Sequence, residues 1–465
     1  MNRQTNKKIV HVVHAVDTEG PLYVDIDAKF ETLSELLDID GLEKSQETLD
    51  AILTRKIDLG EKQDIACRVM SSHRNNYMDS WEKLGGMLDH AMAPETRMQV
   101  PDSFGKGYVY NWFCLDHIGY EINPRRRELG FHRIFDYYAA RIDAQEKDRG
   151  DTWDRDGLHW HFHPMSIYKE AHRCATSLLN SPHISETLAR RIIERNWFPS
   201  SVRCGFQTER PDIHWFLEQY VPFDFTNTSI EDSTELDDMA DLAHGRFGDW
   251  RRAPRGWGVY NPSHDDYQVP GNCRRYIARA LNILSRFANL EDAEVDKAFR
   301  QADTGEPTLL AIATHDFRDL APEAAALSEM LAAAAKRFPD VSFRYSEAVD
   351  AMRAVAHGGD AGEALKLGVE LERDGDGTPV AARIDTLAGE VFGPQPFLAI
   401  ETRGGRVLHD NLDFGTDGRT WRYTFDFETV PGNDLAAIGV GAADKFGNTA
   451  VDVVRNELSV SGSTR

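Results

Sequence analysis

Residues Lys8–Val16 read KIVHVVHAV, a mainly apolar run that leads directly into the acidic turn DTEGP, Asp17–Pro21. A continuous apolar run of this length, followed by turn residues, is typical of a parallel strand that is covered on both faces. Barrel enzymes gather their active-site residues where such strands end. The stretch therefore predicts an α/β fold with functional residues at the end of the first strand.

Strand-like and helix-like segments alternate from this strand to about residue 357. We expect further strands within GYVYNWFCLDH (107–117), GLHWHF (157–162), SSVRCGF (200–206) and PTLLAIAT (307–314), and helices over 132–144, 190–197, 272–290 and 321–339. Alternation of this kind implies a parallel sheet with helices on its faces. At this length we predict a closed (β/α) barrel over residues 1–357 and not an open doubly wound sheet.

The pattern changes after the glycine-rich link at Gly358–Gly362. Short alternating runs separated by Gly, Asp and Asn turns, such as TWRYTFDFETV (420–430), predict a small immunoglobulin-like β-sandwich over residues 363–465. Its aromatic residues offer little beyond Trp421 and Tyr423 for binding a glycan. We therefore expect this domain to serve assembly, including contacts within a homo-oligomer.

Composition limits the classes of function. The chain has 465 residues, 41% of them hydrophobic, which is enough for a large core. Its formal net charge of -23 argues against a nucleic-acid partner. The five cysteines are scattered and without CxxC spacing, so we expect reduced thiols. No signal-peptide pattern or membrane-length apolar run is present, which favours a cytoplasmic protein without a membrane span.

Three alternating histidines mark the strongest candidate site. In GLHWHFHP (157–164), His159, His161 and His163 would project from one face of an extended strand. Neutral imidazoles are common ligands for divalent metal ions. This stretch therefore predicts a metal site.

Other candidate residues follow other predicted strands. Asp17 and Glu19 end the first strand, Arg203 lies in the SSVRCGF segment, and His315 follows PTLLAIAT. Separately, the segment APRGWGVYNPSHDDYQVPG (253–271) places Trp257 and Tyr260 in an aromatic loop. That composition suits a sugar-binding wall, although aromatic loop residues more often serve packing.

Together these segments resemble the polysaccharide deacetylases, the chitooligosaccharide deacetylase-like group of carbohydrate esterase family 4. GLHWHFHP matches their G-x-H-x-x-x-H-P motif, and VDTEGP, VRCGF and IATHDF resemble three further motifs in the family's order. Three departures indicate a divergent member: Asp17-Thr18-Glu19 replaces two adjacent aspartates, the arginine motif lacks its proline, and IATHDF lacks a leucine. The separation of 140 positions between Glu19 and His159 implies an insertion between the first two motifs.

The resemblance implies a role for each candidate residue. His159 and His163 would bind a divalent metal ion with one acid of DTE, and the other acid would act as general base. We predict Glu19 as the ligand and Asp17 as the base, with the opposite assignment still open. Arg203 would orient or charge the base, and His315 would protonate the leaving amine. His161 has no family counterpart, and we group it with Trp257 and Tyr260 as substrate-binding residues.

The expected reaction is removal of an N-acyl group from an amino sugar or glycan. Zinc is the expected metal ion, and Co, Ni or Mn are alternatives. Other functions stay open: a metal-dependent hydrolase of a non-sugar amide or of a phosphoester, and a glycan-binding protein that has lost turnover.

Overall fold

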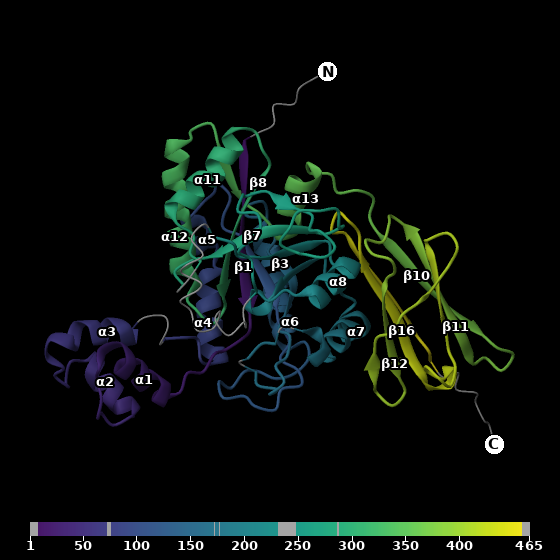
Figure 1. The fold of residues 1–465 in the computed structure, drawn as a ribbon, viewed down its shortest axis with the longest axis horizontal. Helices are drawn as coiled ribbons and strands as arrows, with labels where there is room; N and C mark the ends of the chain where they lie inside the picture. The colour runs from purple at the N-terminus through teal and green to yellow at the C-terminus, as the bar shows by residue number, and fades with distance from the viewer. Residues whose placement is uncertain are drawn as a thin grey trace.

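A closed parallel barrel forms the centre of the molecule. The computed structural model describes residues 8–71, 76–171, 173–175, 177–230, 248–285 and 288–457. Within these residues seven parallel strands close on themselves, because β1 pairs with both β2 and β8 (Figure 1). In order around the barrel they are β1 (Ile9–Thr18), β2 (Tyr110–Cys114), β3 (Gly157–Phe162), β4 (Ser201–Cys204), β5 (Phe223–Asn227), β7 (Tyr276–Asn282) and β8 (Thr308–His315). The predicted (β/α) barrel is confirmed.

Helices cover the outer surface of the barrel. The two remaining strands of this sheet are β6 (Val259–Tyr260), antiparallel to β7, and β9 (Ser342–Tyr345), parallel to the first half of β1. The covering helices are α4 (Trp81–Ala91), α5 (Pro94–Gln99), α6 (Arg133–Arg149), α7 (His183–Arg195), α8 (Pro211–Tyr220), α11 (Asp292–Asp303), α12 (Leu320–Arg337) and α13 (Ala348–His357). Short 3-10 turns are η1 (Gly60–Lys62), η2 (Leu178–Asn180), η3 (Gly205–Gln207) and η4 (Gly432–Asp434).

Alternation along each strand separates two cores. Val12 and Val16 of β1 pack outward with the helices, whereas Val13 and Ala15 belong to a core shared with Phe113 and other inward residues. The apolar inward positions give way to polar ones where the strands end: Asp17, His161, Arg203 and His315. The site therefore lies at the carboxyl end of the barrel, on an apolar floor.

One predicted helix is wrong. Residues 276–282, within the expected helix 272–290, form strand β7. This strand is covered on both faces, and its outward Arg279 is buried over the Trp257 ring. A strand that is buried on both faces lacks regular alternation of apolar and polar residues, so the apolar residues around Arg279 also matched the 3.6-residue repeat of a helix.

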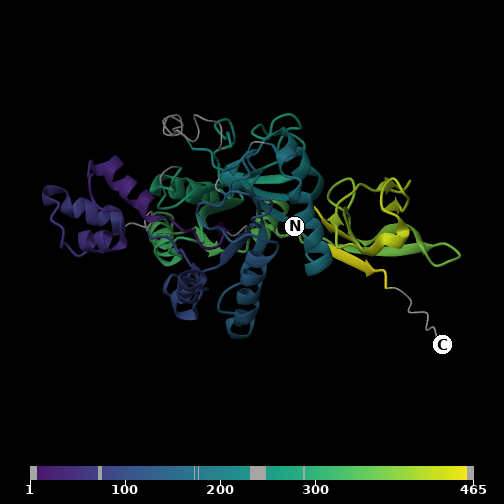
Figure 2. The same ribbon diagram turned by 90° about the horizontal axis from the view of Figure 1, so that it is seen from below.

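A small helical lobe lies between β1 and β2 in the sequence. It consists of α1 (Ile26–Leu37), α2 (Gln46–Leu53) and α3 (Gln63–Ser71), and it has its own apolar core around Leu33 and Ile52. The side chains of Asp25 and Ser45 cap the first two helices by accepting backbone N–H bonds. Figures 1 and 2 show the lobe on the side of the barrel away from the C-terminal domain. It occupies part of the long separation between the first two motifs.

Two antiparallel sheets follow the barrel. One contains β10 (Lys366–Arg373), β11 (Pro379–Ala388), β15 (Thr420–Thr424) and β14 (Asp413–Phe414). The other contains β13 (Val407–Leu408), β12 (Phe397–Thr402), β16 (Leu435–Ala443) and β17 (Thr449–Arg455). Ile384 and Trp421 of the first sheet share a core with Leu398 and Ile438 of the second.

The second of these sheets packs against the barrel helices. Ile192 of α7, Phe198 and Tyr220 of α8 form one apolar core with Phe397 and Ala399 of β12. Gly441 lies so close to Phe198 that a side chain there would force a shift. The outer face of that sheet is thus used within the chain.

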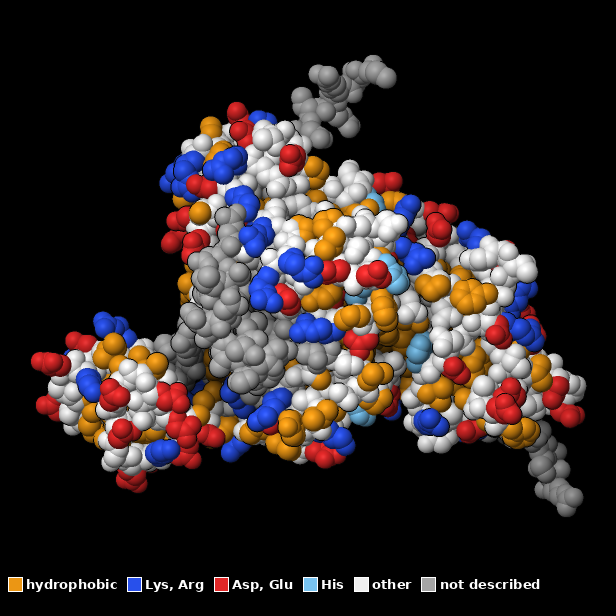
Figure 3. All heavy atoms as spheres, viewed as in Figure 1, with side chains coloured by type: hydrophobic (Ala, Val, Ile, Leu, Met, Phe, Trp, Pro, Cys, Tyr) orange, Lys and Arg blue, Asp and Glu red, His pale blue; other side chains and the backbone are white. Residues whose placement is uncertain are grey.

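Charged groups of both signs are mixed over the surface. Figure 3 shows lysine and arginine interspersed with acidic side chains on the visible face, with acidic groups along the α1–α3 lobe. Among the described helices, none has the length and apolar character needed to cross a bilayer.

Candidate metal centre

Glu19, His161 and His163 bring three ligand atoms together at the carboxyl end of the barrel. One donor atom from each residue lies within 4.8 Å of the other two. The Nε2 atoms of the two histidines are 3.1 Å apart, and His163 Nε2 is 3.6 Å from Glu19 Oε1. Two imidazoles and a carboxylate are a ligand set that suits zinc and leaves coordination positions open. We call these three residues the ligand cluster.

The surroundings of His161 leave its Nε2 atom available as a ligand. Its Nδ1–H donates to the Arg203 carbonyl oxygen at 2.6 Å, so the proton of the neutral ring is on Nδ1. Burial, together with the nearby His163, lowers the pKa of His161 well below its usual value. Nε2 therefore carries a lone pair, 3.1 Å from His163 Nε2, and can serve as a metal ligand.

Glu19 is held by an arginine that the sequence did not suggest. Arg127 Nη2 lies 2.6 Å from Glu19 Oε2, and both side chains are buried. Burial alone would raise the pKa of Glu19, but Arg127, His163 and His315 together lower it well below the usual range. The other oxygen, Oε1, faces His163 and His315 at 3.6 Å each. Glu19 is thus an ionised carboxylate with one oxygen directed into the ligand cluster.

Asp17 lies beside the ligand cluster but outside it. Arg203 Nε donates to its carboxylate at 2.9 Å, and Arg203 Nη1 is bound to the Phe225 carbonyl. Burial raises the pKa of Asp17, against the opposing effect of Arg203. His315 Nε2 is 4.0 Å from Asp17 Oδ2. The structure thus brings Asp17, Arg203 and His315 together next to the three ligand atoms.

His315 is the most open member of this group. Its side chain is 32% exposed, whereas those of Asp17 and Glu19 are 3% and 5% exposed. Burial is the main cause that lowers the pKa of His315 to about 4, so the ring is neutral at neutral pH. An exposed imidazole beside two buried acids is placed to meet a substrate.

Asp316, which follows His315, holds the turn that carries Glu19. Its carboxylate accepts the backbone N–H groups of Glu19 and Gly20 at 3.0 and 2.9 Å and the hydroxyl of Tyr138 at 2.8 Å. Asp316 therefore does not orient the neighbouring His315. It ties the end of β8 to the turn after β1.

His159 lies outside the ligand cluster, in contrast to its predicted role. Its Nε2 is 3.2 Å from Asn111 Oδ1 and 3.1 Å from Oε1 of Glu347, the N-cap residue of α13. A side chain at Gly157 would overlap the His159 ring, so the glycine that begins the motif makes room for this orientation. Alternation placed three histidines on one face, but residues on one face of a tilted strand lie at different depths in a barrel. His161, grouped with the substrate-binding residues from sequence, takes the place expected for His159.

The predicted aromatic wall is not supported. Trp257 is fully buried, and its indole N–H donates to the Glu294 carbonyl oxygen at 2.9 Å. Tyr260 lies on the antiparallel strand β6, and its hydroxyl donates to the Tyr267 carbonyl oxygen at 2.7 Å. Both side chains serve packing in this structure.

The loop between β2 and α6 supplies site residues that the sequence did not reveal. Besides Arg127, His117 donates from Nε2 to the Glu19 carbonyl oxygen at 3.1 Å, and its Nδ1 has no hydrogen-bond partner in the described part of the chain. This loop has no regular periodicity. Its one local signal is the run of three arginines at 125–127.

The η3 backbone passes close to the His163 ring on one side of the ligand cluster. A side chain at Gly205 would overlap the His163 ring, and Phe206 packs against the same ring with centroids 5.2 Å apart. Phe206 and Gln207 both have positive φ angles, of 53° and 49°. Such backbone strain in non-glycine residues often occurs at functional sites.

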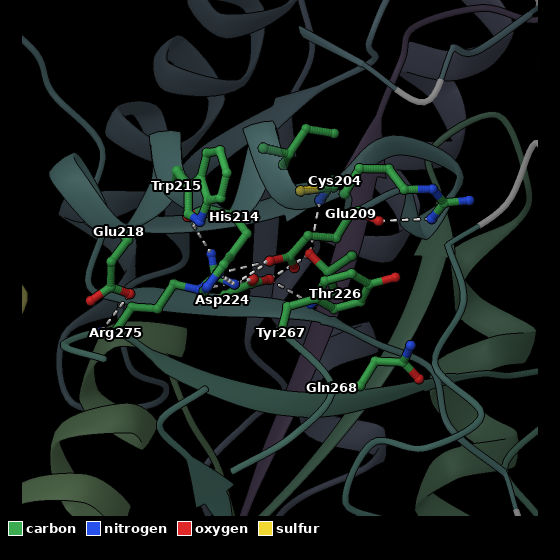
Figure 4. Close-up of polar contacts among 12 residues, drawn as sticks. Cys204, Glu209, His214, Trp215, Glu218, Asp224, Thr226, Tyr267, Gln268 and Arg275 are labelled. Atoms are coloured by element: carbon green, nitrogen blue, oxygen red, sulfur yellow. Dashed lines mark hydrogen bonds and ion pairs between the residues drawn. The ribbon is translucent and has the colours of Figure 1, made fainter. Parts of the chain in front are cut away.

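A buried ionic network lies on the outer side of β5 and the start of β7 (Figure 4). Arg275 pairs with Glu209, and its Nε is 3.7 Å from Asp224 Oδ2. His214 Nδ1 is 3.0 Å from Arg275 Nη2. Burial raises the pKa of Glu209 to about 8, with Arg275 opposing the shift. The network joins α8 to β5 and the start of β7, on the outer side of the strands, and has no contact with the ligand cluster.

Comparison with protein-family models, with curated proteins and with solved structures finds no match. The chemistry of the site is therefore argued from its own residues.

Proposed function

We propose that this protein is a metal-dependent hydrolase that removes an N-acyl group from an amino sugar or a glycan. The observation that carries the proposal is the ligand cluster flanked by the Asp17–Arg203 pair and by His315. Amide hydrolysis needs an activated water, a base, an acid and stabilisation of the oxyanion. The motif resemblance to polysaccharide deacetylases supports the choice of an acyl amide on a sugar.

Each residue then has a task set by its surroundings. A divalent ion held by Glu19, His161 and His163 would supply a Lewis acid that polarises the acyl oxygen and acidifies water. Asp17, held by Arg203, accepts the proton of the attacking water at its carboxylate. His315, which is neutral before the reaction, receives that proton from Asp17, whose Oδ2 lies 4.0 Å from its Nε2. It then passes the proton to the leaving nitrogen, so that Asp17 and His315 both return to their starting states.

Metal content and substrate profile together test the proposal. We expect protein loaded with Zn to release acetate from N-acetylated chitooligosaccharides, and chelation followed by Zn addition to abolish and restore the rate. Non-sugar N-acetyl amides and p-nitrophenyl phosphate, assayed in parallel, represent the alternative hydrolases. Turnover of the phosphoester alone would contradict the proposal, and sugar binding without turnover would favour a binding protein.

Asp17→Asn tests the role of the base. The variant should retain its metal and lose about 10²–10⁴ in rate, because a general base contributes this much. Asp292→Asn, at an exposed position of α11, is the matched control and should keep the wild-type rate. Asp17→Asn protein that is purified without metal would reverse the assignments of Asp17 and Glu19.

A further inference from the structure

Three consecutive arginines, Arg125–Arg127, lie beside the ligand cluster in the loop between β2 and α6. All three contact the segment that follows β1. The Tyr23 N–H donates to the Arg125 carbonyl at 3.2 Å, and the Arg126 guanidinium lies 4.0 Å from the centre of the Tyr23 ring. Arg127 forms the ion pair with Glu19. The loop thus places Arg125 and Arg127 along one edge of the site, whereas the exposed Arg126 is stacked on Tyr23.

The positive charge of Arg125 lacks a partner. Among the described residues, no hydrogen bond or ion pair reaches its guanidinium, although the residue is half-buried. Tyr77, Glu19 and Asp25 are near enough to influence its pKa. Glu19, however, pairs with Arg127 at 2.6 Å, and the Asp25 carboxylate caps α1 through the Ala28 N–H at 2.8 Å. Half-burying a cation without a partner is unfavourable, so a missing anion is a natural explanation.

Arg127 provides a second, independent observation. It is 94% buried, and two of its three guanidinium nitrogens, Nε and Nη1, have no hydrogen-bond partner among the residues that the structure describes. Native proteins satisfy most buried polar groups, and exceptions often mark a place for a ligand or water. The loop therefore holds unmet buried donors on Arg127, two positions from the half-buried guanidinium of Arg125.

The balance of charge at the site points the same way. Arg127 offsets Glu19, and Arg203 offsets Asp17. The buried Asp316 carboxylate, which accepts the Glu19 and Gly20 backbone N–H groups, can balance Arg125. A divalent cation in the ligand cluster would then leave the site positive, in a chain of net charge -23. A positive site in an acidic protein selects an anionic ligand at short range.

We infer that the substrate carries an anionic group, a carboxylate or a phosphate, which binds Arg125 next to the acyl group that is removed. The inference rests on the proposed function for the identity of that acyl group. Arginine is suited to this role because its planar guanidinium binds either anion through two parallel hydrogen bonds. Arg125 is thus assigned as a specificity-determining residue.

Matched substrates test the inference in the full-length protein loaded with Zn. N-acetylglucosamine, its 6-phosphate and its 6-carboxylate (the uronate) differ only in the anionic group, and the last two separate phosphate from carboxylate. We expect at least one anionic compound to exceed the neutral sugar about tenfold or more in kcat/KM, chiefly through KM. Arg125→Ala should reduce that preference about tenfold, and Arg125→Lys should retain part of it. Arg126→Ala, a neighbour stacked on Tyr23, should change the preference less than about twofold.

Binding measurements separate this inference from the proposed function. Calorimetric titration of the same three compounds into Asp17→Asn protein loaded with Zn does not depend on turnover. Arg125-dependent binding of an anionic compound without turnover in the wild type would support the inference and contradict the hydrolase. Equal kcat/KM for neutral and anionic compounds would overturn the inference and leave the hydrolase standing. A preference that survives Arg125→Ala, or absence of both turnover and Arg125-dependent binding, would also overturn it.

Discussion

At the scale of single residues, Asp17 and Glu19 differ in their pKa values, although both acids are buried and each is paired with an arginine. Burial raises the pKa of Asp17 despite Arg203, whereas Arg127 and two histidines lower that of Glu19 despite burial. A more basic carboxylate suits a proton acceptor, and a firmly ionised one suits a metal ligand. Two acids separated by one threonine are thereby suited to separate tasks.

Single histidine variants should distinguish the ligands from their neighbour. His161→Ala and His163→Ala each remove one of three ligands, so stoichiometric Zn should be lost. His159→Ala removes a contact with Glu347 and should keep the metal. Metal analysis after dialysis measures the difference. Retention of Zn by His161→Ala and its loss from His159→Ala would restore the ligand pair expected from the sequence.

Glu209 should make the stability of the protein depend on pH. Its folded-state pKa of about 8 lies above the ordinary 4.5, so the folded protein keeps a proton that the unfolded chain has released between these values. Stability should therefore fall as the pH rises through this window, by up to about 1.4 kcal/mol per pH unit.

Glu209→Gln, which mimics the protonated acid, should flatten this decline. Urea unfolding at about pH 5.5 and about pH 8 measures how much the free energy of unfolding changes with pH in the variant and in the wild type. Glu306→Gln, at an exposed position, should leave the wild-type slope unchanged. An equal decline in Glu209→Gln and the wild type would show that Glu209 is ionised throughout.

At the scale of the elements, glycines next to the strands decide where the histidine rings lie. Gly157 at the start of β3 admits the His159 ring, and Gly205 after β4 admits that of His163. Neither glycine has a positive φ, so space and not backbone conformation is the reason for it. The β3 strand alone thus does not place its histidines; the neighbouring backbone does.

Gly205→Ala should displace His163 and weaken metal binding. The added methyl group would overlap the ring, so that the ring or the η3 backbone must shift. We expect Zn affinity to fall about tenfold or more while the far-UV circular dichroism is unchanged.

Gly86→Ala is the matched control for this substitution. Gly86 is exposed in α4, with open space around it, so alanine should raise the free energy of unfolding by about 0.5–1 kcal/mol and leave Zn affinity unchanged. Normal Zn affinity in Gly205→Ala would show that η3 can shift without cost to the site.

At the scale of the whole molecule, the barrel and the C-terminal sheets are joined by an exposed link and a buried interface. Residues 358–363 are exposed, whereas Phe198 and Tyr220 are buried against Phe397. Contacts across an apolar core hold two parts together even when the chain between them is cut. The C-terminal sheets thus act as a support for α7 and α8, the helices on either side of β4.

Limited proteolysis should therefore cut the link without separating the parts. We expect a nick near Gly358–Gly362, two fragments on a denaturing gel, and a single peak of unchanged volume in gel filtration. Phe397→Ser, which places a polar group in the shared core, should allow the nicked fragments to separate. An uncut chain would contradict an accessible link, and separation of the wild-type fragments would contradict a stabilising interface.

The order of strands and helices and the break in composition near residue 358 determined the barrel and the C-terminal β-structure, because hydrophobic periodicity is a local property. The hydrophobic pattern did not identify β7, because a strand that is buried on both faces lacks the two-residue alternation that distinguishes a strand from a helix. Alternation likewise showed that His159, His161 and His163 share a face, but not how deep each ring lies. That depth depends on strand tilt and on the space left by Gly157 and Gly205. Arg127 came from a loop without periodicity, and only closure of the barrel brought it 2.6 Å from Glu19. Local pattern thus determined which residue types were available, and the tertiary structure decided which of them meet, because contacts between distant segments depend on how the strands close.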